Sequence, residues 1–155
     1  MTVVCCMLAA ACTSSDGPTG LAADKQRVAA YLQTLLIDRN WAEWPAYFAD
    51  DAKINGSDFA QQLMRSTADG LNYSFAELQL HVVDQVAEPG HVATFFVLEG
   101  RHQHPFNDQP ATNRRVRLDG FVIDRFDNHR VVESRLFLDV WGLSQRVAAA
   151  GASPR

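Results

Sequence analysis

The period of the hydrophobic pattern changes once along this chain, near Gly70, and that change limits the fold more than any other feature. Before it, apolar residues recur at helical spacing; after it, they alternate with polar residues as in half-buried strands. Helices followed by a run of strands indicate an α+β domain, with the helices packed on one side of a curved sheet. The chain of 155 residues is long enough for one such domain with its own core.

The helical half predicts three helices. The first is expected to run from an N-cap at Asp24 to about Asn40, with one apolar stripe along it. A second, short helix is expected over residues 41–48, and Ser57 is placed to cap a third. The stripe of the first helix consists of Val28, Tyr31, Leu32, Leu35 and Leu36.

The alternating half predicts strands that are separated by turn residues. Pro89-Gly90 and Asp127-Asn128 mark two of these turns. The strand that begins at His91 is apolar on both faces, which indicates a central place in the sheet. The strands are expected at residues 52–55, 78–82, 91–98, 116–126 and 130–141.

The first twenty residues form a separate unit. An apolar run from Val3 to Ala11 is too short to cross a bilayer, which takes about 20 apolar residues. It ends in three alanines before Cys12, an order typical of a bacterial lipoprotein signal in which Cys12 becomes lipidated. Residues 13–20 would then form a polar tether. The run lacks the usual basic start, so a plain N-terminal tail stays open as the alternative.

These features predict the domain organisation and the location of the protein. With a working signal, the protein is extracytoplasmic and anchored to a bacterial membrane only through the lipid on Cys12; without one, it is cytoplasmic. The expected units are a lipoprotein-type signal segment and flexible tether at residues 1–20, one domain at 21–147 and a disordered tail at 148–155.

Charge and cysteine content exclude several classes of function. The formal net charge is −4, from 14 basic and 18 acidic side chains, whereas nucleic-acid binding requires a basic face, so no nucleic-acid partner is expected. Cysteine occurs only at positions 5, 6 and 12. The folded part therefore has no disulfide, no thiolate metal site and no cysteine nucleophile.

Three segments of the second half carry a recognisable pattern. Residues 100–106 read Gly-Arg-His-Gln-His-Pro-Phe, residues 110–116 read Pro-Ala-Thr-Asn-Arg-Arg-Val, and residues 139–143 read Asp-Val-Trp-Gly-Leu. Together with the order of helices and strands over residues 28–143, these segments resemble the SnoaL-like polyketide cyclases of the nuclear-transport-factor-2-like superfamily. Ser134 and Arg135 depart from the pattern, because the family usually has His and Trp there.

The resemblance implies a fold and a kind of chemistry. The fold is α+β, a cone-shaped curved antiparallel sheet with three N-terminal helices packed on it, enclosing a pocket. The matching Asp of these cyclases acts as general acid/base in an intramolecular aldol closure without a cofactor, which gives this role to Asp139. Domains of this architecture commonly dimerise through the outer face of the sheet, so a homodimer is expected.

Asp139 and His102 are therefore the predicted catalytic residues, with His102 orienting the substrate. A proton shuttle needs a raised carboxyl pKa, which burial in an apolar pocket supplies and a nearby guanidinium opposes. Because Arg135 shares a strand face with Asp139, a structural charge cluster that also includes Glu133 stays open as the alternative. The predicted ligand-binding residues are Asn55, His104, Phe106, Arg135, Phe137 and Trp141.

No metal site is predicted, because His102 and His104 are metal-like in spacing but have no identifiable third ligand. Two functions remain open at this point. One is a cofactor-independent cyclase or isomerase acting on a small, largely apolar carbonyl substrate. The other is a non-catalytic, membrane-anchored domain that binds an apolar small molecule.

Overall fold

The structure is a computed structural model, and it describes residues 18–107 and 109–151. The predicted lipidation site Cys12 and most of the predicted signal and tether lie outside the described residues. The helices are α1 (Pro18–Tyr31), a π-helix η1 (Leu32–Ile37), a 3-10 helix η2 (Trp41–Glu43), α2 (Trp44–Tyr47), α3 (Ala60–Ser74) and α4 (Val140–Gly151). The strands are β1 (Phe48–Ile54), β2 (Phe75–Glu88), β3 (His91–His102), β4 (Arg115–Asp127) and β5 (Arg130–Leu138).

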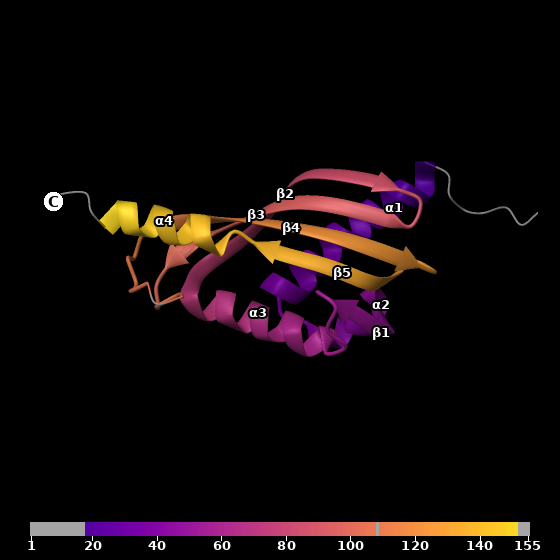
Figure 1. Cartoon of the computed structure of the whole chain (residues 1–155), viewed down its shortest axis with the longest axis horizontal. Coiled ribbons are helices and arrows are strands. Elements are labelled where there is room, and N and C mark those ends of the chain that lie inside the picture. The colour runs from indigo at the N-terminus through magenta and orange to yellow at the C-terminus, as the bar shows by residue number, and fades with distance from the viewer. Residues whose placement is uncertain (1–17, 108, 152–155) are drawn as a thin grey trace, which may run out of the picture.

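The five strands form one curved sheet in the order β1-β5-β4-β3-β2 (Figure 1). Strands β2 to β5 are antiparallel neighbours, as their alternating sequence predicts. The short strand β1 pairs parallel to β5 at the edge, so the sheet is not wholly antiparallel. The predicted α+β fold is confirmed.

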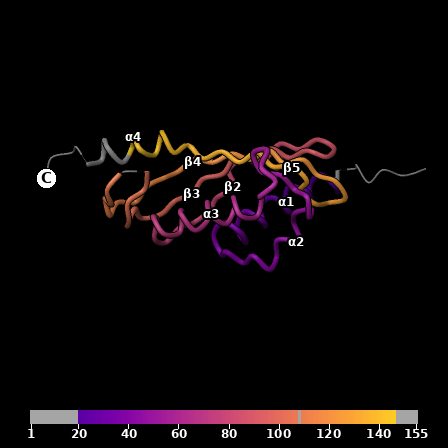
Figure 2. The backbone as a smooth tube through the Cα atoms, turned by 60° about the horizontal axis from the view of Figure 1, so that its bottom comes forward, coloured from indigo at the N-terminus to yellow at the C-terminus, as the bar shows by residue number. Residues whose placement is uncertain are grey.

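Helices α1, α2 and α3 lie on one side of the sheet, and α4 extends beyond its end (Figure 2). The core lies between these helices and the inner face of the sheet. Every residue of the apolar stripe predicted for the first helix is buried in it. The largest fully buried apolar side chains are Tyr31, Phe48, Phe96, Leu32, Leu35, Leu36, Ile54, Met64, Leu71, Leu98 and Leu143.

The ends of two helices differ from the prediction. Helix α1 starts at Pro18, six residues before the expected cap at Asp24, and it changes to a π-helix directly after Tyr31. Helix α4 continues to Gly151, whereas the domain was expected to end at residue 147. Apolar residues at 140, 143 and 147–150 make this last segment a good helix former, which the strand prediction to Trp141 overlooked.

The phase of β5 decides which of its side chains face the helices. Leu136 pairs with Val122 and Ser134 with Asp124, and all four residues are buried on the inner face. Arg135 and the other alternate positions therefore point to the outer face.

Candidate functional site

Asp139 lies at the surface, between the end of β5 and the start of α4. Its side chain is 46% exposed and lies 3.7 Å from the guanidinium of Arg146. Its Oδ1 accepts a hydrogen bond of 2.8 Å from the backbone N–H of Gly142, which is the pattern of a helix N-cap. The expectation that Asp139 looks into an apolar interior is wrong, because the chain leaves the sheet one residue earlier and the side chain caps α4.

A capping role predicts how Asp139 variants behave. Asp139→Ala should lower the free energy of unfolding by about 1 kcal/mol, because it removes the cap. Asp139→Asn should stay within a few tenths of a kcal/mol of the wild type, because an amide oxygen also accepts from Gly142. Urea unfolding of the three proteins measures both values, and equal losses in the two variants would contradict the assignment.

The residues expected beside Asp139 as pocket wall lie on the outer face of the sheet or beyond it. Phe137 is 57% exposed and Trp141 is 76% exposed. Arg135 points outward and lies 3.5 Å from Glu133, so only this part of the predicted charge cluster forms. Arg135 and Phe137 lie on the same face of β5, as their spacing predicts, but this face is the outer one.

Asn55 supports the sheet, because both polar atoms of its side chain bond to the backbone of β5. It adopts a left-handed conformation, with φ of 51°, in the turn after β1. Its amide donates to the carbonyl oxygen of Leu136 at 3.0 Å and accepts from the N–H of Leu136 at 2.9 Å. Both hydrogen bonds hold the end of β1 against β5.

The two predicted histidines do not form one site. His102 is 1% exposed at the end of β3; its ring lies 5.5 Å from that of Phe75, and Nδ1 is 3.4 Å from the hydroxyl of Thr112. Burial lowers the pKa of His102, so it is neutral at pH 7. His104 instead stacks on Tyr73 with ring centroids 4.6 Å apart, at the C-terminal end of α3.

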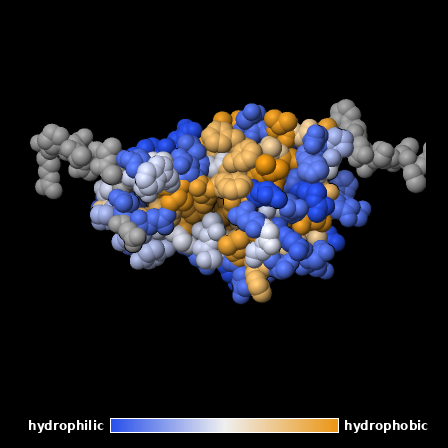
Figure 3. Space-filling view, viewed as in Figure 1, coloured by the Kyte–Doolittle hydropathy of each residue, from blue (hydrophilic) through white to orange (hydrophobic). Residues whose placement is uncertain are grey.

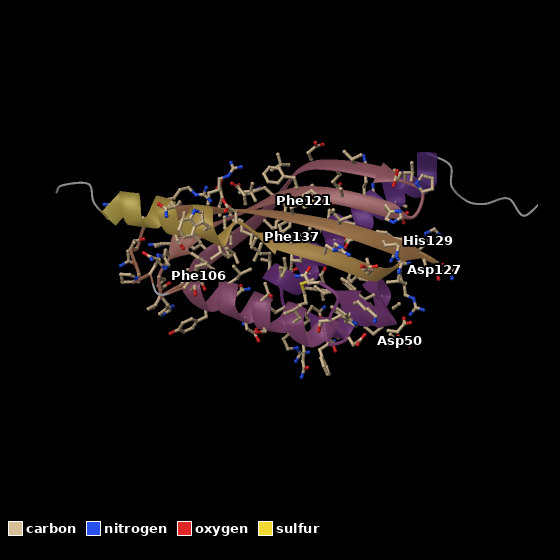
Figure 4. All side chains as sticks on the ribbon, viewed as in Figure 1. Asp50, Phe106, Phe121, Asp127, His129 and Phe137 are labelled. Atoms are coloured by element: carbon tan, nitrogen blue, oxygen red, sulfur yellow. The ribbon has the colours of Figure 1, made fainter. Side chains whose placement is uncertain are left out.

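Phe106 (Figure 4) is half-buried and, like His102, lies against the ring of Phe75. Its ring packs on Phe75 with centroids 5.0 Å apart, so it helps to close the core there. The crevice on this part of the inner face is too narrow to admit a water molecule, and the pocket expected inside the sheet is therefore closed in this conformation. The residues that line the crevice are Phe75, Leu78, Leu98, Gly100, Val116 and Leu118.

A surface groove of about 350 Å³ lies between β1 and the start of α3. Its apolar floor is formed by Trp44, Ala49, Ala52 and Ala60, and its rim includes Asp50 and Phe59. None of the predicted site residues lines it.

A buried carboxyl group lies at the other end of the interior, where no functional residue was predicted. Asp124 of β4 is fully buried, and its Oδ2 accepts a hydrogen bond of 2.8 Å from the hydroxyl of Tyr31. Ser134 of β5 is opposite Asp124 in the strand pairing and is also fully buried. The wide π-helical turn begins directly after Tyr31, and turns of this kind are frequent at functional sites.

The electrostatics of Asp124 are set mainly by burial. Desolvation raises the pKa of its carboxyl from 3.8 to about 7, although Ser134 and Tyr31 lie near enough to lower it in part. No hydrogen bond of ordinary geometry joins Ser134 to Asp124, and Asp124 Oδ1 has no partner among the described residues. Burial, followed by the charge of Asp124, raises the pKa of Tyr31 well above 10, so the phenol stays neutral and donates its proton.

The sequence itself contains a signal for Asp124. Asp124 stands in the alternation of β4 at the same phase as Val122 and Phe126, which are both inward-facing. A carboxylate is rare at a strand position that faces the core, unless it is paired or functional. The residues that contact it come from α1 and β5, and their proximity could not be read from the alternation.

Asp124 and His102 are too far apart to act on one small molecule. Asp124 pairs with Val92, which precedes His102 by ten positions on β3. At about 3.3 Å per residue, the separation along the strand is roughly 30 Å. His102 therefore cannot orient a small substrate that is held at Asp124.

Within the described ranges, no three histidine, cysteine or acidic side chains come close enough together to hold a metal ion. None of the described helices has both the length and the apolar character that crossing a bilayer requires.

Comparison with known proteins agrees with the fold. Solved structures that superpose on the chain include the putative polyketide cyclase IdmH from Streptomyces antibioticus, with a TM-score of 0.71, 18% identity and coverage of 81% of this chain and 98% of that one. The putative hydroxylase AclR from Streptomyces galilaeus gives a TM-score of 0.69, 21% identity and coverage of 83% and 98%. A SnoaL-like polyketide cyclase from Agrobacterium tumefaciens superposes with a TM-score of 0.67 and 18% identity. The match covers 80% of this chain and 97% of that one.

A search of curated proteins finds no match. The family model described as SnoaL-like polyketide cyclase matches residues 7–147, which is most of the chain. The chain therefore belongs to the SnoaL-like polyketide cyclase family.

Proposed function

We propose that this protein is a cofactor-independent enzyme of the cyclase or isomerase type, with Asp124 as the acid/base group acting on a small, largely apolar carbonyl compound. One observation carries the proposal: Asp124 is a fully buried carboxyl whose pKa is raised to about 7. An acid/base catalyst works best when its pKa lies near the working pH, because both of its protonation states are then populated.

Tyr31 fixes the orientation of this carboxyl. Its hydroxyl donates to Asp124 Oδ2, so Oδ1 is the oxygen that has no hydrogen bond of ordinary geometry among the described residues. Enolisation of a ketone needs a proton donor at the carbonyl oxygen and a base that removes the α-proton. The acid form of Asp124 gives its proton to the oxygen, and the carboxylate that remains takes the α-proton, which restores the acid. A substrate must displace inward-facing side chains to reach Asp124, because the interior is packed in the present conformation.

Deuterium exchange at the α-carbons of cyclopentanone in D₂O tests this proposal without knowledge of the natural substrate. The wild type is expected to accelerate the exchange near neutral pH, and Asp124→Asn is expected to lower the catalysed rate by about 100-fold or more, because the amide cannot exchange a proton with the ketone. Proton NMR of the α-hydrogens measures the rate.

Asp127→Asn is the matched control, because it removes an exposed carboxylate from the end of the same strand. It should leave the exchange rate unchanged. An Asp124→Asn variant that is as fast as the wild type, or a wild type no faster than buffer, would rule out the acid/base role.

The second candidate function is a non-catalytic, membrane-anchored domain that holds an apolar small molecule. The surface position of Asp139 favours it, because the residue predicted as the acid/base group caps α4 and does not face an apolar interior. We propose for this case that Cys12 carries the lipid and that the domain is extracytoplasmic. Native mass spectrometry of the full chain, produced in a bacterial host, tests both parts: it would detect a lipid mass on Cys12 and a co-purified apolar molecule.

We also propose that the protein is a homodimer through the outer face of the sheet. Hydrophobic side chains gather across the middle of this face (Figure 3), and Phe121 and Phe137 lie there as neighbours (Figure 4). Beside them is a hollow of about 270 Å³ lined in part by Ile123 and Arg135, into which a protruding side chain of a second copy could fit. Exposed apolar patches of this kind commonly mark protein interfaces.

Sedimentation measures this prediction directly. The wild type should be a dimer at micromolar concentration, and Phe137→Glu should be a monomer, because it places a charge in the apolar contact. Phe59→Glu is the control, since Phe59 is 71% exposed but belongs to the helical side. A monomeric wild type, or dissociation by both variants alike, would refute the interface.

A further inference from the structure

The hollow of about 270 Å³ on the outer face of the sheet is lined mainly by side chains that can carry a charge. Its lining crosses three strands, since His91 of β3 lies opposite Arg125 of β4, which in turn lies opposite Glu133 of β5. The next row of the lining pairs Ile123 with Arg135. Three of these five side chains are basic and one is acidic, so the hollow is suited to an anion.

The charges in the hollow do not cancel. The carboxylate of Glu133 lies between two guanidinium groups, 3.6 Å from Nε of Arg125 and 3.5 Å from Nη2 of Arg135. Two positive charges and one negative charge leave one positive charge over, before any protonation of His91 is counted. Glu88, which lies 3.9 Å from His91, is not part of the lining.

Both arginines keep most of their hydrogen-bonding capacity. A guanidinium group has five N–H donors, and its strong bonds to a carboxylate are roughly 2.7–2.9 Å long. The contacts of Arg125 and Arg135 with Glu133 are longer than that, and neither side chain has another ion pair or hydrogen bond within the described residues. Because the two side chains are 49% and 64% exposed, their remaining donors are accessible to an anion from solvent.

An apolar strip begins at the hollow and runs along β4 towards the middle of the face. Ile123 is part of the wall of the hollow, and Phe121 is the next outward-facing residue of the same strand. Phe137 of β5 pairs with Phe121, and both rings are exposed (Figure 4). The strip from Arg125 to Phe121 is about 13 Å long, at about 3.3 Å per residue. A surface that is cationic at one end and apolar along the rest is complementary to an amphiphilic anion.

We propose that the hollow binds the carboxylate of a small amphiphilic acid, whose apolar part lies along this strip. Guanidinium groups bind planar carboxylates through paired N–H donors, so Arg125 and Arg135 suit this headgroup. An uncharged ligand would gain nothing from the net positive charge, and an organic cation would be repelled by it. Asp124 lies on the inner face of the sheet, so this inference goes beyond the proposed function and does not depend on it.

Titration of the full chain with 4-methylbenzoate tests the proposal, since this acid carries a carboxylate on one apolar ring. Nitrogen-15 NMR is expected to show saturable shifts of the backbone amide signals at residues 123–125 and 133–135. Arg135→Gln should weaken binding about fivefold, because it removes the net positive charge of the hollow. The uncharged 4-methylbenzamide should bind about fivefold more weakly than the acid and should not respond to Arg135→Gln.

Glu133→Gln separates a binding role from a loss of structure, because its expected effect has the opposite sign. It leaves both guanidinium groups without a carboxylate, so the affinity for 4-methylbenzoate should rise about fivefold. Arg117→Gln is the matched control, because Arg117 lies on the outer face of β4 and pairs with Asp119 at 2.8 Å, outside the hollow. It should bind the acid as the wild type does.

Equal affinities in Arg135→Gln, Glu133→Gln and the wild type would overturn the site, and so would equal binding of the acid and the amide. The titration is repeated with the protein diluted below its range of dimerisation. Binding that appears only after this dilution would show that a second copy fills the hollow, and would also overturn the site. Saturable binding at both concentrations, with opposite effects of the two variants, supports it.

Discussion

The wild type is expected to lose roughly 4 kcal/mol of unfolding free energy between pH 4 and pH 8 that the Asp124→Asn variant does not lose. The cause is the carboxyl of Asp124, whose pKa burial raises from 3.8 to about 7 in the folded protein. Below pH 4 both the folded and the unfolded states hold this proton. As the pH rises, the unfolded chain releases it first, and the folded state is destabilised by about 1.4 kcal/mol per pH unit.

Above pH 7 the folded protein releases the proton as well, so the loss stops there. Urea unfolding of both proteins at several pH values between 4 and 8 measures the difference. Titrations of the other acidic groups are common to the two proteins and cancel. A difference that does not change with pH would mean that Asp124 is not held as a buried acid, and the proposed acid/base role would lose its physical basis.

The parts of the fold that follow from local pattern could be predicted from the sequence. The stripe that includes Val28 and Leu35 is buried as helical spacing requires, and strands β2 to β5 follow the alternation. Helix α4 was missed because Trp141 and its neighbours were read as the continuation of β5. The parallel pairing of β1 with β5 joins segments about eighty residues apart, so no local pattern contains it.

The candidate site was harder to predict, for a reason that lies in β5. Residues 134–138 carry apolar side chains at both phases, namely Leu136 and Leu138 on one side and Phe137 on the other. Alternation alone therefore could not say which phase faces the helices. Choosing the phase of Phe137 placed Asp139 inside, whereas the pairing of Leu136 with Val122 places the interior on the other side.

Asp124 is the opposite case, because the alternation of β4 alone indicates that its side chain faces the core. It interrupts a clear apolar phase in β4, and the structure places it where that phase predicts, on the inner face. Its partner Tyr31 was predicted as a core residue of the first helix, which is correct, but the hydrogen bond between them depends on how α1 crosses the sheet. In this chain, the polar residue at a core-facing position of a strand, Asp124, indicates the candidate site better than Asp139, which matches a family motif at the end of a strand.

Gly120→Ala should destabilise the protein by about 2–3 kcal/mol, although alanine is ordinarily the better residue in a strand. A Cβ at this position would lie 2.3 Å from the ring of Phe96, which pairs with Gly120 across β3 and β4 and is fully buried. The ring cannot move aside without leaving its place in a close-packed core. Gly70→Ala in α3 is the matched control: its Cβ meets nothing within 4 Å, so it should stabilise the helix by up to about 1 kcal/mol.

The clash can be separated from other effects by a double-mutant cycle, because Phe96 is the residue that must give way. Phe96→Leu alone should cost about 1–2 kcal/mol through lost packing, and it makes room above Gly120. The double variant should therefore be at least 1 kcal/mol more stable than the sum of the two single losses predicts. Chemical unfolding of the four proteins gives this coupling energy, and a value near zero would show that the Phe96 ring does not lie over Gly120 in solution.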